Sequence, residues 1–168
     1  MKNRCDLCSM FFKTTNRYNS KTGNAIVDKV VKLHETSLSE KNIALQTIIP
    51  ETLVVFADEN LISQVLINLL KNAIEAIEPN SNERIIISAE VNSEGRINLN
   101  VADTGSPIPQ DILPNIFVPF FTTKLSGSGI GLSVSRYIMR LHGGKLIHFV
   151  SHDGMTVFQL ELNPVESE

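Results

Sequence analysis

The chain has 168 residues, a formal net charge of −3 and an ordinary globular composition, with 42% hydrophobic residues. This length is enough for one well-packed domain and too short for two full ones. The small net charge gives no indication of a nucleic-acid-binding protein, and the sequence contains neither a run of about 18 apolar residues nor a signal-peptide core. We therefore expect a soluble piece with no contact to nucleic acid or membrane, which does not exclude a membrane-attached parent protein.

The first 23 residues lack the periodicity of a folded element. A polar, turn-rich stretch follows four scattered apolar residues, Leu7, Met10, Phe11 and Phe12. We predict that residues 1–23 are the end of an element that continued upstream, followed by a linker. The pair Cys5 and Cys8 has no second cysteine pair or nearby histidine to complete a zinc site, so reduced thiols are the favoured interpretation.

Helix and strand patterns begin at residue 25. Apolar residues at helical spacing predict a helix over residues 25–39, and alternating apolar residues predict strands at 43–49 and 53–57. A long amphipathic helix is then predicted over residues 58–78, with Asp58 as its N-cap.

The polar face of this long helix carries two asparagines, Asn68 and Asn72. Asparagine costs about 0.5–0.7 kcal/mol of helix propensity, and residues at positions i and i+4 share one face. Two amide oxygens one turn apart suit a hydrated Mg²⁺ ion, which accepts few protein ligands. The alternative interpretation is a core helix with an ordinary solvated back.

The second half of the chain contains two hairpins and a further helix. In chain order we predict a strand pair at 84–91 and 97–101, and then a short helix at 111–116 and a loop at 118–129. A helix at 129–141 and a second strand pair at 145–150 and 155–162 follow. The order of all elements predicts an α/β fold of the α+β type. This fold is a two-layer sandwich in which a mixed, mainly antiparallel sheet carries helices on one face.

Glycines recur at alternate positions, Gly127, Gly129 and Gly131, where the loop enters the last predicted helix. Glycine lets backbone N–H groups approach an anion, and a helix N-terminus adds roughly half a positive charge. A phosphate chain fits such a place, although a flexible turn before a helix is an equally acceptable interpretation. The pattern is neither the dinucleotide-binding motif nor a Walker-type loop.

An acidic residue and a glycine, Asp103 and Gly105, end the second strand of the first hairpin. A buried carboxylate can accept a hydrogen bond from the exocyclic amine of a purine, and a neighbouring glycine lets the base approach the backbone. Taken alone, this pattern is more typical of an aspartate that begins a turn.

Five motifs follow one another in order along the chain. They are Asn68-Leu69-Leu70-Lys71-Asn72-Ala73, Asp103-Thr104-Gly105, Ile116-Phe117-Val118-Pro119-Phe120-Phe121-Thr122-Thr123-Lys124, Gly127-Ser128-Gly129-Ile130-Gly131-Leu132 and His142-Gly143-Gly144. Together they resemble the N box, first glycine box, F box and second glycine box of the sensor histidine kinases. These kinases share an ATPase superfamily with gyrase, the Hsp90 chaperones and MutL. The resemblance covers residues 24 to about 162 and implies an ATP-binding catalytic domain with the Bergerat-type sandwich fold.

The resemblance implies roles for the residues at matching positions. Asn72 would be the Mg²⁺ ligand, Asn68 would lie in the catalytic site at the phosphate end, and Asp103 would hold the adenine amine. Lys124 would be a second catalytic-site residue, in contact with the phosphates. The residues implied to bind or cover ATP are Gly105, Phe117, Thr123, Lys124, Gly127, Gly129, Gly131 and Leu132.

Position 68 distinguishes the branches of this superfamily. Members that hydrolyse ATP, and the anti-sigma serine kinases, carry a glutamate there that acts as a general base. Asn68 cannot accept a proton, so we expect the γ-phosphoryl of Mg-ATP to be transferred to a protein. An ATPase or serine kinase of the same superfamily is the disfavoured alternative.

The implied phosphoacceptor histidine is missing from this chain. Its motif continues with a proline that does not follow His34, which we interpret as an exposed helix residue. The implied partners are therefore a separate dimerisation domain that carries the acceptor histidine, and a response regulator downstream. The catalytic domain would span residues 24–163 with a tail at 164–168, and a homodimer through residues 1–23 is compatible with this arrangement. The implied location is the cytoplasm, with a parent that can be attached to the inner membrane.

Pro107 departs from the family pattern, which usually has glycine at this position. Proline fixes φ and removes an N–H group, so the hinge of the segment over the nucleotide should be stiffer. This departure supports an alternative in which the chain is a degenerate nucleotide-binding or interaction module that no longer transfers phosphate.

Overall fold

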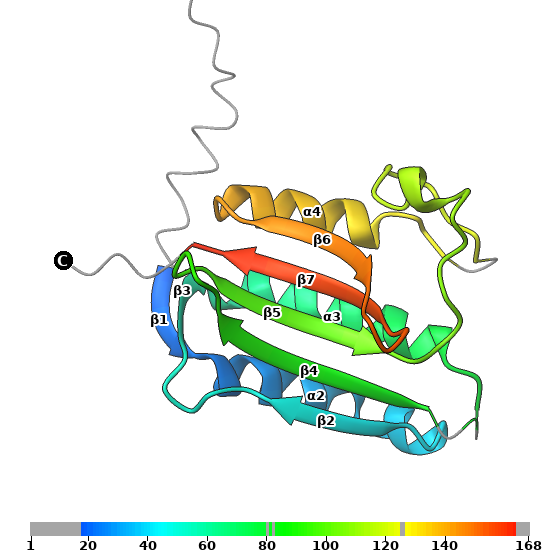
Figure 1. The fold of residues 1–168 in the computed structure, drawn as a ribbon, viewed down its shortest axis with the longest axis horizontal. Helices are drawn as coiled ribbons and strands as arrows, with labels where there is room; N and C mark the ends of the chain where they lie inside the picture. The colour runs from blue at the N-terminus through cyan, green and yellow to red at the C-terminus, as the bar shows by residue number, and fades with distance from the viewer. Residues whose placement is uncertain (1–17, 80, 82, 125–126, 164–168) are drawn as a thin grey trace, which may run out of the picture.

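The computed structural model describes residues 18–79, 81, 83–124 and 127–163 (Figure 1). The expectations for residues 1–17, including the pair Cys5 and Cys8, lie outside the described residues. The elements are β1 (Tyr18–Thr22), α2 (Gly23–Glu40), β2 (Ala44–Ile48), β3 (Val54–Asp58), α3 (Glu59–Ala76), β4 (Arg84–Val91), β5 (Ile97–Asp103), η1 (Leu113–Asn115), α4 (Gly131–Leu141), β6 (Lys145–Val150) and β7 (Thr156–Leu162).

The predicted two-layer sandwich is confirmed. A five-stranded sheet has the order β2-β4-β5-β7-β6, in which only the β2–β4 pair is parallel among the strand pairs of this sheet. The helices α2, α3 and α4 lie behind one face of this sheet, as Figure 1 shows. The side chains of β5 alternate between buried and half-buried, because every second residue points toward the helix layer.

The strand β1 was not predicted, because its polar residues read as part of a linker. It pairs antiparallel with β3, from Tyr18 opposite Asp58 to Thr22 opposite Val54, in a separate two-stranded sheet. The apolar residues Val55 and Ala57 of β3 are buried. Pairing with a neighbouring strand thus overrides the weak local preference of the β1 sequence.

The predicted long helix is confirmed as α3, and Asp58 is its N-cap. The Asp58 side chain accepts hydrogen bonds from the backbone N–H groups of Asn60 at 2.9 Å and Leu61 at 3.2 Å. The apolar face of α3 is buried against the core, and Leu70 is 0% exposed. On its opposite face, Asn68 and Asn72 are half-buried.

The C-terminal end of α4 is tied to the start of α3 by His142. Its Nε2 accepts from the backbone N–H of Asp58 at 3.2 Å, and its Nδ1 lies 2.8 Å from the carbonyl oxygen of Ile138. This pattern places the proton on Nδ1, which donates to the carbonyl. Gly143 follows with φ +65°, so the predicted glycine stop of this helix is confirmed.

Three local predictions differ from the structure. The helix predicted at 129–141 begins at Gly131, and the one predicted at 111–116 is only the short 3-10 turn η1, which contains Pro114. His34 is half-buried instead of exposed, and its Nδ1 lies 3.0 Å from the carbonyl oxygen of Val30.

The variant Leu70→Ala should lower the free energy of unfolding by about 2–5 kcal/mol, because it leaves a cavity between α3 and the sheet. Chemical denaturation measures this change. The control Leu33→Ala removes a leucine that is 64% exposed on α2, and it should stay within about 0.5 kcal/mol of the wild type. Equal effects of the two variants would contradict the assigned core.

Candidate functional site

A cavity of about 510 Å³ opens between α3, the ends of β5 and β7, the loop from Ser106 to Gly129 and the first turn of α4. It brings together most of the predicted site residues, which come from segments far apart in the sequence. Those that line it are Asn68, Asn72, Asp103, Thr123, Lys124, Gly127, Gly129, Gly131 and Leu132. Gly105 and Phe117 were also predicted for the site, but they are not among the lining residues.

The Asp103 carboxylate lies at one end of the cavity and is 3% exposed. Burial raises the pKa of Asp103 to about 6. The N–H of Gly105, which donates to Oδ1 at 3.0 Å, acts in the opposite direction, and the charge of Glu83 adds to the rise. Among the described residues, Gly105 donates a hydrogen bond to Oδ1 of this carboxylate. The other oxygen, Oδ2, can therefore accept a hydrogen bond from a ligand.

Gly105 lies behind the cavity wall, where the chain leaves β5 and crosses the end of α3. A Cβ atom at Gly105 would lie 2.6 Å from the carbonyl oxygen of Ala76, and the next N–H, that of Ser106, donates to the same oxygen at 3.0 Å. Glycine is therefore required for this close approach of two backbones. The neighbouring Pro107 forms part of the wall, and the cavity remains open beside it.

The two asparagines of α3 both reach the cavity, but they have different surroundings. Asn68 donates from Nδ2 to the hydroxyl of Ser135 on α4 at 3.0 Å. Asn72 makes no recorded hydrogen bond to any residue that the structure describes. An amide oxygen without a protein partner fits Mg²⁺, which takes one or two protein ligands and completes its shell with water and phosphate oxygens.

The charges beside the asparagines form a small network on the cavity wall. Lys124 makes an ion pair with Glu75, and Lys71 lies 3.8 Å from the same carboxylate, one helical turn away on α3. All three side chains line the cavity. In this structure, therefore, Lys124, which was predicted to contact the phosphates, is paired with the carboxylate of Glu75.

Phe117 does not cover the cavity. Its ring packs edge-on against Phe158, with ring centroids 6.5 Å apart, and the guanidinium of Arg136 lies over the Phe117 ring, 5.0 Å from its centroid. Phe117 thus attaches the start of the loop to β7 and α4. By contrast, Phe120 is 77% exposed and has φ +66°.

A second glycine requirement occurs at Gly129, where the loop returns to α4. Its carbonyl oxygen accepts from the N–H of Phe120 at 2.9 Å, and a Cβ atom at Gly129 would lie 2.5 Å from the backbone of Phe120. The positive φ of +66° at Gly129 also disfavours a side chain. The middle of the loop, at Phe120, is therefore fastened to its end at Gly129.

Two site residues, Thr156 and Glu75, were missed from the sequence. Thr156 is buried, lines the cavity and lies directly opposite Asp103 in the β5–β7 ladder. Side chains directly opposite in a ladder lie on the same face of the sheet, so Thr156 belongs to the same end of the site as Asp103. The sequence placed Thr156 near the start of a predicted strand at 155–162, which does not reveal the strand opposite.

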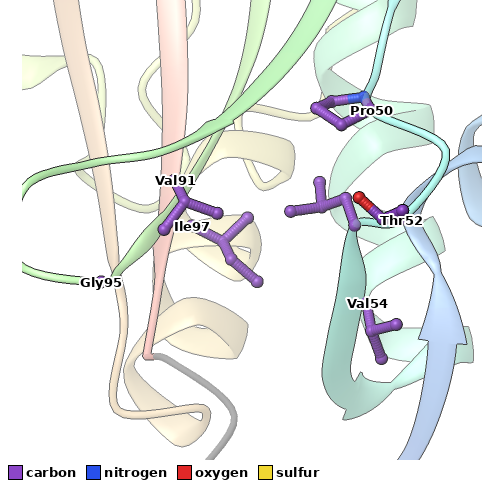
Figure 2. Close-up of a pocket in the computed structure, with 7 residues that line it drawn as sticks. Pro50, Thr52, Val54, Val91, Gly95 and Ile97 are labelled. Carbon is purple, nitrogen blue, oxygen red and sulfur yellow. The ribbon is translucent and has the colours of Figure 1, made fainter.

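A second cavity, of about 300 Å³, is much less suited to chemistry. It lies near Val91 and Ile97 at the hairpin end of β5, with Pro50 and Val54 on its other side (Figure 2). Ile97 and Asp103 are separated by six residues of extended strand, about 20 Å. The residues lining this second cavity include no titratable side chain.

The described residues contain no group of three or more His, Cys, Asp or Glu side chains placed to hold a metal ion. None of their helices is both long and apolar enough to cross a membrane.

A family model described as "Histidine kinase-, DNA gyrase B-, and HSP90-like ATPase" matches residues 57–166. The chain belongs to this family. The matched segment begins at β3 and contains α3, the hairpin β4–β5, α4 and the final hairpin, which include every element around the cavity. ATP is therefore the ligand expected of this fold.

Among its relatives, this ATPase domain is 34% identical over 138 residues to the sensor protein FixL of Bradyrhizobium diazoefficiens, a match that covers 82% of this chain and 27% of FixL. Sporulation kinase A of Bacillus subtilis is 35% identical over 128 residues, which cover 76% of this chain and 20% of the kinase. The chain thus spans between a fifth and about a quarter of these two proteins.

The structure is similar to the nucleotide-free catalytic domain of histidine kinase ThkA, with a TM-score of 0.77 and 37% sequence identity. That match covers 86% of this chain and 94% of the ThkA domain. A further match is histidine kinase ThkA in complex with the response regulator protein TrrA, with a TM-score of 0.71 and 31% identity over 96% of this chain and 47% of that one. Within the ATPase family, the chain is thus a catalytic domain of the histidine kinase type, and the serine kinase and clamp ATPase alternatives are not favoured.

The variant Asp103→Asn should be more stable than the wild type at pH 7 and should lose ATP binding. The raised pKa means that the folded state favours the protonated carboxyl of Asp103. The contribution of this group to the stability of the wild type is therefore complete below pH 3.8 and is lost as the pH rises to about 6. Above pH 6 the variant should gain at most about 3 kcal/mol. Denaturation between pH 4 and pH 7 measures the difference.

The matched control is Asp28→Asn, which removes an exposed carboxylate from α2. Its stability should follow that of the wild type within about 0.5 kcal/mol at every pH. A stability difference between wild type and Asp103→Asn that does not change with pH would contradict the assignment of a buried, destabilising carboxylate.

Proposed function

We propose that this domain binds Mg-ATP in the large cavity and transfers the γ-phosphoryl to a histidine on a separate dimerisation domain. The observation that carries the proposal is the presence of two complementary ends in one cavity. A buried carboxylate, Asp103, lies at one end, and the glycine-rich start of α4, with Gly127 and Gly131, lies at the other. These ends match the two parts of a nucleotide.

At the adenine end, Asp103 would accept a hydrogen bond from the exocyclic amine. Gly105 holds the carboxylate through Oδ1, and the Thr156 hydroxyl lies opposite on β7. A site that is built to pair with a donor strongly rejects a ligand that lacks it, because the buried acceptor is then left without a partner. We therefore expect preference for adenine over guanine, which has a carbonyl at the corresponding position.

At the phosphate end, the first turn of α4 would donate backbone N–H groups to the phosphate chain. The N-cap residue Ile130 has no side chain that caps these groups. Uncapped N–H groups and the helix dipole both favour an anion. Lys124 would exchange its ion pair with Glu75 for a contact to the phosphates.

Mg²⁺ would be held through Asn72, beside the phosphate end. When bound, the ion neutralises the charge that develops on the phosphate oxygens during transfer. The residues around it have simpler tasks, which are to orient the phosphate chain and to exclude water. Asn68 occupies the place of a general base and cannot remove a proton from water, which favours transfer to a protein over hydrolysis.

The acceptor and the later steps lie outside this chain. We infer that the acceptor histidine belongs to a dimerisation domain upstream of a catalytic domain at residues 24–163, and that a response regulator receives the phosphoryl group. The exposed apolar residues Val118, Phe120 and Tyr137, beside the site, offer a surface for the acceptor domain. We place the domain in the cytoplasm, where ATP is available, in a parent that can be anchored to the inner membrane.

The second candidate is a degenerate module that no longer transfers phosphate, as Pro107 suggested. The open cavity with Pro107 in its wall does not favour this alternative. Phosphorylation of an acceptor domain supplied in trans would exclude it.

A calorimetric titration of ATP tests the binding proposal. We expect a dissociation constant between about 1 μM and 1 mM with Mg²⁺. Asn72→Ala should remove the Mg²⁺ dependence, and Asp103→Ala should abolish binding of ATP and AMP alike. The control Asp28→Asn should bind as the wild type does. Absence of binding to the folded wild type would overturn the proposal and favour the interaction module.

The variant Glu75→Gln should strengthen ATP binding about two- to five-fold, because it frees Lys124 and removes a negative charge from the phosphate end. The gain should be larger at low salt, since these side chains are partly exposed. The control Glu78→Gln changes an exposed glutamate that does not line the cavity. Weaker ATP binding by Glu75→Gln would instead show that Glu75 helps to place Lys124 on the phosphates.

A further inference from the structure

The start of α4 contains a notch that receives the side chain of Asn68. The notch is formed by Gly131 and Ser135, which lie one helical turn apart on the same face of α4. A Cβ atom at Gly131 would lie 2.1 Å from Oδ1 of Asn68, so any larger residue would displace this amide. Glycine at this position therefore serves the Asn68 contact in addition to any anion.

The other side of the notch is a hydrogen bond. The hydroxyl of Ser135 is 1% exposed and lies 3.0 Å from Nδ2 of Asn68. Since Nδ2 is used by Ser135, the amide presents Oδ1 toward Gly131, where both residues line the cavity. Because Ser135 is buried, loss of this hydrogen bond costs the desolvation of its hydroxyl, so the bond favours one orientation of the half-buried Asn68 amide.

We propose that Ser135 is a positioning residue for the phosphate end of the site, which acts by holding the Asn68 amide in one orientation. Ser135 is not among the residues lining the cavity, so it has no contact of its own with a ligand there. Its effect passes through Asn68, whose oxygen then faces the Mg²⁺ and phosphate region. This inference rests on the proposed binding of Mg-ATP.

The orientation also determines what Asn68 offers to a ligand. An amide that presents oxygen accepts hydrogen bonds, for example from water bound to Mg²⁺, whereas a rotated amide would present its NH₂ group. The serine hydroxyl thus selects an acceptor in the position where a hydrolysing relative would need a base. Ser135 is on α4 and its partner Asn68 is on α3, so this hydrogen bond also connects the two helices across 67 residues of sequence.

Titrations of Ser135→Ala with Mg-ATP and with AMP test this inference. Loss of one oriented hydrogen bond should weaken Mg-ATP binding about three- to ten-fold, while AMP, which depends on the adenine end, should bind within about two-fold of wild type. In the Asn68→Ala background, Ser135→Ala should cause no further loss. Ser135→Thr, which keeps the hydroxyl, should restore ATP binding.

The matched control is Ser63→Ala on α3. Ser63 is also a buried helical serine, 4% exposed, and its hydroxyl has no hydrogen-bond partner among the described residues. This variant should leave the affinity for both nucleotides unchanged. If Ser135→Ala binds Mg-ATP as the wild type does, weakens AMP equally, or still weakens ATP when Asn68 is absent, the inference is wrong.

A nucleotide-free measurement separates this inference from the proposed function. In ¹⁵N spectra, the side-chain NH₂ signal that disappears in Asn68→Ala identifies Asn68. It should show slow hydrogen exchange in the wild type and lose this protection in Ser135→Ala. A wild type that binds no ATP would overturn the proposed function, and an unprotected Asn68 amide in the wild type would overturn the role of Ser135.

Discussion

The packing of α3 between the sheet and the cavity is the constraint on which the site depends. The apolar face of α3 is buried, with Leu70 fully inaccessible to solvent, and this fixes the rotation of the whole helix about its axis. The rotation in turn determines that Asn68, Asn72 and Glu75 face the cavity. The end of α3 meets the backbone at Gly105, which places Asp103 at the other end of the same cavity.

The site contains polar groups that do not favour folding, and each of them can bind a polar or charged ligand. The Asp103 carboxylate is buried at a cost, the first turn of α4 has no side-chain cap, and the Asn72 amide has no recorded partner among the described residues. Each of these groups can be satisfied by one part of a magnesium nucleotide. A ligand that binds only the folded state stabilises it, so the proposed nucleotide would offset the cost of these groups.

The charges around the phosphate end are arranged as a balance instead of a simple positive patch. Lys71 and Lys124 both lie near Glu75, so each of these two cations in the cavity wall has a carboxylate beside it. Under the proposed function, a nucleotide would compete with Glu75 for Lys124. This competition connects nucleotide binding to the loop that carries Lys124, and Phe117 anchors the other end of that loop on β7 and α4.

Most elements followed from the sequence, because amphipathic periodicity, the Asp58 N-cap and glycine-rich turns are local properties. Most residues named from the motif resemblance line the cavity. The strand β1, the position of Thr156 opposite Asp103, the inward packing of Phe117 and the contact between Asn68 and Ser135 were decided only by the tertiary structure. Each depends on the register or packing of segments that are distant along the chain. Local preference carries no information about such contacts, since the same serine or threonine is equally acceptable on an exposed face.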